Sequence, residues 1–136
     1  MPEVYIDSNI FFYAKIMDGV FGKPCSKVIR KIADRNLEAS ISALVPLEVG
    51  NALRKYGLGA KAAEEVRGIF SLGMKVYSID AVDAQEAMEV FEALGVNPYD
   101  CLHSVLMRKN GVRQIVSVDK EFDKIEWLER IDPESA

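Results

Sequence analysis

The feature that most constrains the fold is a regular alternation of short apolar segments with longer amphipathic ones. The short segments are typical of β-strands, because they are rich in β-branched and aromatic residues and are bounded by turn residues. They lie at residues 3–7, 38–42, 75–79 and 114–118, with a weaker candidate at 129–131. Since these strands are almost continuously apolar and are separated by helices, we expect a parallel sheet that is covered on both faces.

The segments between the strands carry helix signals. Helices are predicted at residues 24–35, 42–56, 60–73, 81–94 and 97–110, with a helical or turning stretch at 8–15 and a short helix at 120–124. Pro24 and Pro98 stand at first helical positions, while Gly57, Gly95 and Gly111 follow helix ends. The prediction is an α/β fold: a three-layer α/β/α sandwich around a central parallel sheet of four to five strands.

Length and composition limit the class of protein. A chain of 136 residues suits one domain, and no repeat or linker divides it, so we expect residues 1–136 to form a single domain. Cys25 and Cys101 are too few for a disulfide framework or a zinc site, and we expect both to be buried in a protein of a reducing compartment. No signal peptide and no apolar run of about 20 residues is present, which predicts a cytoplasmic location and no membrane partner.

Two aspartates directly follow predicted strands. Asp7 ends the first strand and Asp119 ends the fourth. In open α/β sheets, ligands bind beyond the carboxyl ends of the strands, where the strand order reverses, so both carboxylates lie at the edge where a site is expected. Each aspartate also allows a second interpretation, because Asp is a favoured turn residue and helix N-cap.

Three further acids are of interest. Glu48 shares an apolar helix face with Leu44, where a carboxylate needs a salt bridge or a metal to compensate its burial. Asp100 follows Asn97 by three residues, so with Asn97 as N-cap it also suits the helix dipole and a capping box. Asp123, taken alone, is typical of a surface charge.

The five carboxylates together indicate a metal site. Oxygen ligands from several segments are what Mg²⁺ and Mn²⁺ prefer, and such ions promote phosphoryl displacement. The sequence lacks the ligands of a zinc hydrolase, a Gly-rich phosphate loop and a nucleophile elbow. Its one histidine, His103, follows Asp100 by three residues. An acid–base role is conceivable for His103, but the pattern favours a packed or capping role.

Four segments, in this order, resemble motifs of the PIN domain family of nucleases, which includes VapC-type toxins. YIDSNIFFY resembles the family's opening Asp-x-Asn strand end, and PLEVGNALRK resembles the helix that bears its glutamate. NPYDCLHSVLM resembles the helix that bears the third acid, and IVSVDKEFDKI resembles the closing Thr/Ser-x-Asp-x-x-Phe motif. The resemblance extends from residue 4 to about residue 125.

The resemblance implies a fold, a site and an activity. The first and fourth strands would be adjacent, and one pocket would hold one or two Mg²⁺ or Mn²⁺ ions for the hydrolysis of RNA. Its catalytic and metal-binding acids would be Asp7, Glu48, Asp100 and Asp119, with Asp123 as a fifth metal ligand. Asn9 and Ser117 would orient two of these acids by hydrogen bonds. The partners implied are an RNA substrate, an antitoxin protein and a second copy of the chain in a homodimer.

Substrate contacts would come from basic side chains outside the acidic motifs. The candidates near the exit of the first strand and along the helix of Glu48 are Lys15, Lys23, Lys27, Arg30 and Arg54. Solvated helix faces explain the same residues equally well. The net charge of −4 does not support nucleic-acid binding by itself, although catalytic carboxylates lower the net charge of a protein that still has a basic rim.

Motifs of other enzyme and binding-domain classes are incomplete in this sequence. A phosphatase of the haloacid dehalogenase class needs Asp-x-Asp after its first strand, but Asn9 stands at the second position. A receiver-like domain needs an acidic pair before its phosphorylated aspartate, and the spacing does not supply one. A catalytically silent PIN-like partner-binding module and a DNA nuclease both keep the fold and remain alternatives.

Overall fold

The apolar segments form five parallel strands close to the positions expected from the sequence. The computed structural model describes residues 2–136. The strands are β1 (Val4–Ile6), β2 (Ala39–Ser42), β3 (Lys75–Tyr77), β4 (Gln114–Val116) and β5 (Glu129–Ile131). They form one sheet in the order β3-β2-β1-β4-β5, and every neighbouring pair is parallel. The predicted parallel sheet is confirmed.

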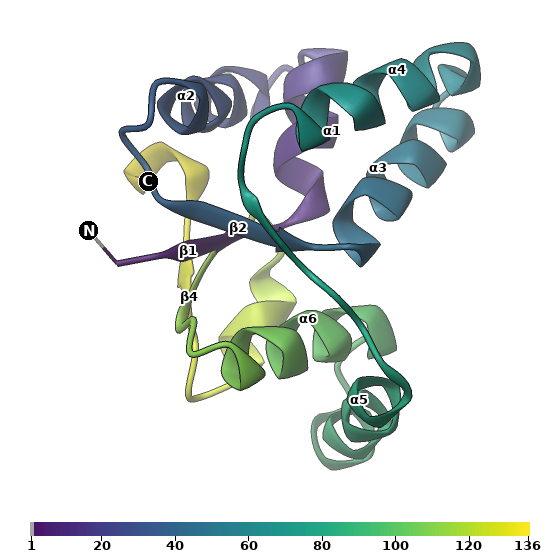
Figure 1. The fold of residues 1–136 in the computed structure, drawn as a ribbon, viewed down its shortest axis with the longest axis vertical. Helices are drawn as coiled ribbons and strands as arrows, with labels where there is room; N and C mark the ends of the chain where they lie inside the picture. Colours follow the sequence, from purple (N-terminus) through teal and green to yellow (C-terminus); the bar gives the residue numbers. More distant parts are fainter. Residues whose placement is uncertain (1) are drawn as a thin grey trace.

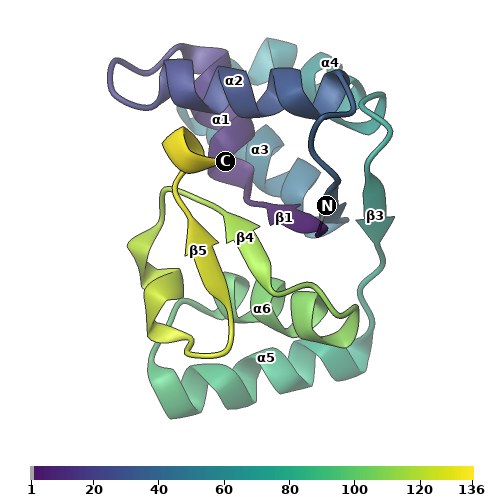
Figure 2. The same cartoon turned by 90° about the vertical axis from the view of Figure 1, so that its left-hand side faces the viewer.

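Helices cover both faces of this sheet (Figures 1 and 2). On one face lie α1 (Ser8–Ile16), α2 (Gly22–Ala33), α3 (Leu44–Lys55) and α4 (Gly59–Phe70). On the other face α6 (Pro98–Lys109) lies next to the strands, and α5 (Ala81–Leu94) packs on the outer side of α6. Two short 3₁₀ turns, η1 (Lys120–Lys124) and η2 (Pro133–Ser135), complete the chain. The three-layer α/β/α prediction is therefore confirmed.

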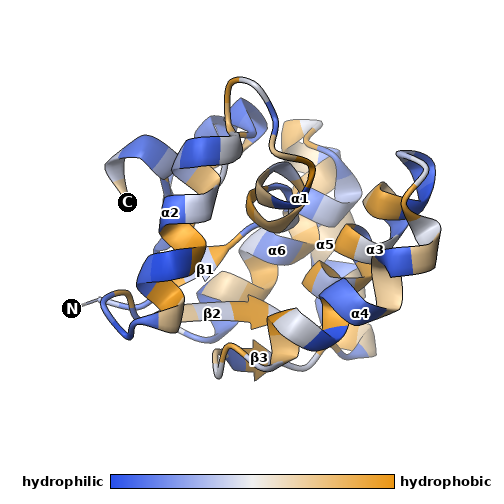
Figure 3. Ribbon diagram, turned by 90° about the horizontal axis from the view of Figure 1, so that it is seen from above, coloured by the Kyte–Doolittle hydropathy of each residue, from blue (hydrophilic) through white to orange (hydrophobic). Residues whose placement is uncertain are grey.

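Amphipathic helices and apolar strands build the core. In Figure 3, α2 shows alternating hydrophobic and hydrophilic bands. Its apolar side chains Val28 and Ile32 are buried in the hydrophobic core. All residues of β1 and β2 are buried. Among residues 2–136, no helix has the length and apolar character needed to cross a membrane.

The third strand departs from the expectation of burial on both faces. Lys75 is exposed, and the Val76 side chain keeps 41% of its surface accessible. The reason is the position of β3 at the edge of the sheet, where it pairs only with β2. A short apolar segment therefore does not by itself identify a central strand.

The strand order reverses at β1. The chain builds outward from β1 through β2 to β3 on one side, and β4 and β5 lie on the other side. β1 and β4 pair in parallel with Ile6 opposite Val116, as the resemblance implied. Both strands consequently end at the same edge, where Asp7 and Asp119 follow them. This edge is the topological switch point at which open α/β sheets bind ligands.

Candidate active site

The Asp7 carboxylate is buried directly after β1 and is held by hydrogen bonds from three residues, Ser8, Asn9 and Ser117. Its Oδ1 caps α1 by accepting a hydrogen bond from the Ser8 N–H at 2.7 Å. Its Oδ2 accepts from the Ser117 hydroxyl at 2.6 Å and from the Asn9 amide at 3.0 Å. The N-cap interpretation of Asp7 and the site interpretation are compatible, because the two oxygens have different partners.

Ser117 links the ends of β1 and β4. Besides donating to Asp7, its Oγ accepts hydrogen bonds from the Asp119 N–H at 2.9 Å and from Asn9 Nδ2 at 3.1 Å. Asp119 caps η1 by accepting from the Glu121 N–H at 2.9 Å. Asn9 and Ser117 therefore contact Asp7 and each other, and together they fix the relative position of the two aspartates.

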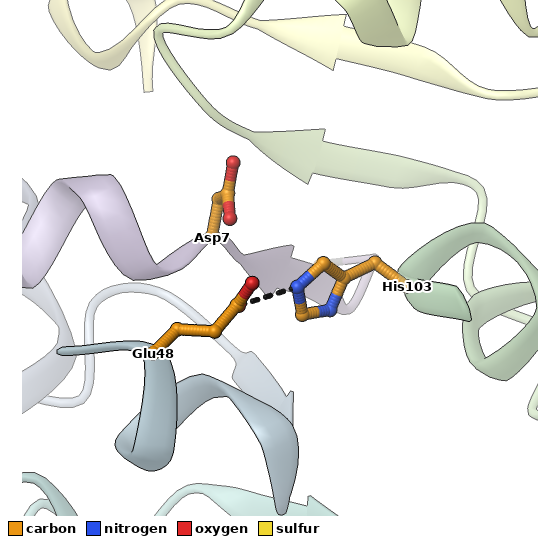
Figure 4. Close-up of side chains that lie close together, drawn as sticks. All are labelled: Asp7, Glu48 and His103. Atoms are coloured by element: carbon orange, nitrogen blue, oxygen red, sulfur yellow. Dashed lines mark hydrogen bonds and ion pairs between the residues drawn. The ribbon is translucent and has the colours of Figure 1, made fainter. Parts of the chain in front are cut away.

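Glu48 and His103 reach this edge from opposite layers of the fold. Glu48 comes from α3 and His103 from α6, and one ligand atom of each lies within 4.8 Å of the other and of an Asp7 oxygen (Figure 4). His103 Nε2 is 2.6 Å from Glu48 Oε1. Because a carboxylate only accepts hydrogen bonds, the imidazole is the donor. Glu48 is thus compensated by a hydrogen bond from His103, which becomes an ion pair when the imidazole is protonated.

The second ring nitrogen of His103 is also engaged. Its Nδ1 lies 2.6 Å from the Tyr5 hydroxyl, and that hydroxyl donates to Ser42 Oγ at 2.8 Å. From the sequence we expected a packed or capping His103; it is packed, but its links to Glu48 and Tyr5 were missed. One signal was present: Tyr5 precedes Asp7 by two residues on one strand, so the two side chains leave the same side.

Asp100 lies in the first turn of α6, beside Asp119. Asn97 caps this helix, since its side chain accepts a hydrogen bond from the Tyr99 N–H at 2.8 Å. Burial raises the pKa of Asp100 to about 8, and the neighbouring carboxyls of Asp119 and Asp7 act in the same direction. The first-turn position that suited a capping role thus also brings Asp100 to the other acids.

Negative charge at this edge is concentrated and only partly compensated. Burial raises the pKa of Asp7, although His103 and the hydrogen bonds from Ser117 and Ser8 oppose that change. Burial acts to lower the pKa of His103, but the hydrogen bond and charge of Glu48 outweigh it, and the pKa is raised. A bound divalent cation would relieve this accumulation of carboxylates.

The sequence matches the family model of the PIN domain over residues 4–128, which is most of the chain. The chain belongs to the PIN domain family. No curated protein matches it at a significant level, so the family model and the solved structures are the comparisons that inform this PIN domain.

Several solved structures are similar to this PIN domain. VapC20 of Mycobacterium tuberculosis, a sarcin–ricin loop cleaving toxin, has a TM-score of 0.77 and 16% identity, and the match covers 93% of this chain and 97% of VapC20. DNA-bound VapBC from Salmonella typhimurium has a TM-score of 0.70 and 19% identity, with 98% and 99% covered. A toxin–antitoxin complex from Klebsiella pneumoniae has a TM-score of 0.66 and 13% identity, with 96% and 97% covered. These likenesses show a shared fold.

The donor set of this PIN domain suits a hard divalent cation. The side chains that could hold one are carboxylates: Asp7, Glu48, Asp100 and Asp119. Oxygen donors of this kind fit Mg²⁺ or Mn²⁺. His103 does not offer a free lone pair, because both of its ring nitrogens are engaged in hydrogen bonds. It acts instead as the partner of Glu48.

Asp123 lies on the surface and has a different partner. Its carboxylate forms an ion pair with Arg130 of β5, with Oδ1 3.0 Å from Nε, and 53% of the Asp123 side chain is exposed. Arg130 also donates to the Ser117 carbonyl at 3.0 Å. Asp123 therefore stabilises the connection between η1 and β5, and its role as a fifth metal ligand stays a prediction.

The basic residues predicted to contact substrate do not form one group. Lys15 pairs with Glu65 of α4 at 2.7 Å, which joins two helices of the same layer. Arg54 donates to the Asn51 side chain at 2.8 Å on the exposed side of α3. The others, Lys23, Lys27 and Arg30, are exposed on α2. Their substrate contacts stay predictions, and the solvated-face interpretation explains their positions as well.

Proposed function

We propose that this PIN domain is a divalent-metal-dependent ribonuclease that hydrolyses RNA phosphodiester bonds. One observation carries the proposal: acids from four separate segments converge at the switch point between β1 and β4. Asp7 lies with Glu48 there, and Asp100 lies beside Asp119. The match to the PIN family model supports the same chemistry. RNA as the substrate is supported by the likeness to VapC20, a sarcin–ricin loop cleaving toxin.

The side chains of the site divide into two roles. The four acids would hold Mg²⁺ or Mn²⁺, and the ion, when bound, activates water and stabilises charge on a phosphodiester. Ser117 and Asn9 hold Asp7 by hydrogen bonds of 2.6 and 3.0 Å, which keeps its carboxylate oriented before any ion binds. The attacking water would form a bond to phosphorus and pass a proton to one of Asp100, Asp119 or Asp123, while the bond from phosphorus to the 3′-oxygen breaks. The departing 3′-oxygen would take up a proton, so the products would carry 3′-hydroxyl and 5′-phosphate ends.

We further propose that the chain is the toxin of a toxin–antitoxin pair. The Klebsiella pneumoniae structure is a toxin–antitoxin complex, and the match covers 97% of the chain that resembles this one. The reading frame next to the gene should then encode a small partner, and the two products should co-purify when expressed together. The homodimer expected from the resemblance is tested by light scattering, which should give twice the chain mass of 15.2 kDa.

A cleavage assay tests the enzyme directly. Labelled single-stranded and structured RNA would be incubated with Mg²⁺, Mn²⁺ or EDTA and the partner-free protein. The Asp7→Asn variant should lose activity by about 100-fold or more while staying folded, because Asn also caps helices well. Asp34→Asn, an exposed aspartate at the end of α2, is the matched control and should cleave like the wild type.

Each outcome of this assay distinguishes between functions. Metal-dependent cleavage of RNA that disappears in Asp7→Asn supports the ribonuclease. Cleavage of labelled DNA but not RNA would instead show a DNA nuclease with the same site. A folded, partner-free protein that cleaves no RNA with either metal would contradict the ribonuclease proposal and favour a partner-binding module.

A further inference from the structure

A chain of three buried side chains leads from the sheet to Glu48. We infer that Ser42, Tyr5 and His103 are positioning residues that hold the Glu48 carboxylate at the metal site. The inference rests on the proposed metal-dependent function. His103 would then be neither a metal ligand nor a general base. Tyr5 and Ser42, which are not acids of the site, would help to fix the geometry of the site.

The polar groups of Ser42, Tyr5 and His103 form hydrogen bonds to one another inside the protein. Ser42, Tyr5 and His103 are each 0% exposed, so their polar atoms depend on protein partners. Tyr5 OH lies 2.8 Å from Ser42 Oγ and 2.6 Å from His103 Nδ1, and His103 Nε2 lies 2.6 Å from Glu48 Oε1. The Tyr5 hydroxyl and both ring nitrogens of His103 are satisfied within this series, and Ser42 Oγ also accepts a hydrogen bond from the Leu44 N–H at 3.3 Å. Loss of the Tyr5 hydroxyl therefore leaves His103 Nδ1 without its partner.

The hydrogen-bonded residues belong to the sheet and to the helices on both of its faces. Ser42 ends β2, Tyr5 lies in β1, and His103 is in α6 on the far layer. Glu48 comes from α3 on the opposite layer and is the only member that is partly accessible, with 24% of its side chain exposed. A long carboxylate side chain at the surface loses rotamer entropy when it binds an ion. Hydrogen bonds that anchor the Glu48 side chain to the centre of the sheet restrict its rotamers before the ion binds. Less rotamer entropy is therefore lost on binding.

The hydrogen bonds of the His103 imidazole determine whether it can bind a metal. A metal ligand needs a nitrogen lone pair, and a nitrogen that donates a hydrogen bond has none to offer. The Nε2 atom of His103 donates to Glu48, and Nδ1 is paired with Tyr5. For His103 to bind the ion, one of these two short contacts would have to break. The arrangement matches a histidine that orients a ligand rather than one that is a ligand.

Mn²⁺ binding to the EDTA-treated protein, measured by isothermal titration calorimetry, tests the inference without using activity. Tyr5→Phe keeps the ring and removes one hydroxyl, and it should weaken Mn²⁺ binding by about fivefold. His103→Ala should weaken it by roughly 10–100-fold. His103→Gln keeps a donor near the Nε2 position and should recover most of the affinity lost in the alanine variant.

Tyr77→Phe is the matched control. The Tyr77 hydroxyl bonds the Glu3 side chain at the β3 edge of the sheet, and its removal should leave Mn²⁺ affinity unchanged. Circular dichroism and thermal unfolding in EDTA check that each variant is folded. Because the chain has one histidine, the imidazole ¹⁵N signals are assigned without ambiguity. In Mg²⁺-saturated protein, Tyr5→Phe should shift the Nδ1 signal, while Nε2 keeps its proton.

The outcomes separate this inference from the proposed function. Wild-type affinity in a folded Tyr5→Phe variant would overturn the positioning role and leave the metal site intact. Equal losses in His103→Gln and His103→Ala, with an Nε2 that loses its proton when Mg²⁺ binds, would show that His103 is a ligand and would also overturn it. A wild type that binds no Mn²⁺ would contradict the proposed function, and the positioning role would fall with it.

Discussion

At the scale of single residues, two of the proposed site acids, Asp7 and Asp119, are also structural residues. Asp7 caps α1 and Asp119 caps η1, while each lies at the edge where β1 and β4 end. The helix caps orient the carboxylates, so the same hydrogen bonds that begin a helix also prepare the site. This arrangement concentrates negative charge at one edge of the sheet, and the raised pKa of Asp100 shows that effect most clearly.

The pKa of Asp100 predicts how metal-free stability depends on pH. Its pKa is about 8 in the folded protein, because of burial and neighbouring acids, whereas an unfolded Asp has a pKa of about 3.9. Ionisation therefore favours the unfolded chain, and the folded protein loses stability as pH rises through this interval. Asp100→Asn cannot ionise, so its Tm in EDTA should exceed that of the wild type by an amount that grows from pH 5.5 to pH 8.5.

Differential scanning fluorimetry of both proteins measures this difference. About 1 kcal/mol shifts the Tm of a domain of this size by roughly 3–5 °C, which is easily resolved. Parallel pH curves for wild type and Asp100→Asn would show that Asp100 is not the group responsible. The same variant should bind Mg²⁺ more weakly, because it has lost a charged oxygen ligand.

At the scale of elements, the start of α6 connects helix formation to the site. Asn97→Ala removes the side chain that accepts the Tyr99 N–H, and loss of such an N-cap costs about 1 kcal/mol. The first turn, which carries Asp100, should fray, so we expect a lower Tm together with weaker Mn²⁺ binding. Thermal unfolding and calorimetry on the same sample measure the two effects.

The capping box at the start of α5 gives a matched control. Asp80 accepts a hydrogen bond from the Asp83 N–H, and the Asp83 side chain accepts one from the Asp80 N–H. Asp80→Ala should also lower the Tm, but α5 carries none of the site acids, so Mn²⁺ affinity should stay at the wild-type value. Equal affinities in Asn97→Ala and the wild type would show that the cap does not position Asp100.

The elements themselves were largely predictable from the sequence. Strand and helix positions follow from local apolar patterns and caps, and Asp7 and Asp119 could be placed because each directly follows a strand predicted from the sequence. The edge position of β3 could not be deduced, since local composition does not report the order of strands in a sheet. The contact between Glu48, His103 and Tyr5 was missed for a similar reason: α3, α6 and β1 meet only through tertiary packing.

At the scale of the whole molecule, the reactivity of the two cysteine thiols measures how readily the folded protein opens. Cys25 and Cys101 are each 0% exposed, as expected from the sequence. Burial, with the nearby charges of Asp132 and Asp18, raises the pKa of the Cys25 thiol to about 12. Since the thiolate is the reactive form, the native protein should resist Ellman's reagent at neutral pH, and both thiols should react in concentrated guanidinium.

Metal binding should slow this labelling further, because an ion that binds only the folded protein stabilises it against opening. Cys101 is the neighbour of Asp100 on α6, so its reaction requires that α6 opens. Mg²⁺ that binds only the folded state should reduce the labelling rate of Cys101 in the wild type and have little effect in Asp100→Asn. Rapid labelling of Cys101 in the native, metal-loaded protein would contradict the packing of α6 described above.

The most direct test of the proposed metal site is the position of a bound ion. Crystals of the protein grown with Mn²⁺ would be measured for anomalous scattering of the metal. We expect a peak at the end of β1 and β4, within bonding distance of the Asp7 carboxylate and of at least two among Glu48, Asp100 and Asp119, with His103 still bonded to Glu48. A peak elsewhere, or full Mn²⁺ occupancy with Asp7 uninvolved, would contradict the proposed site.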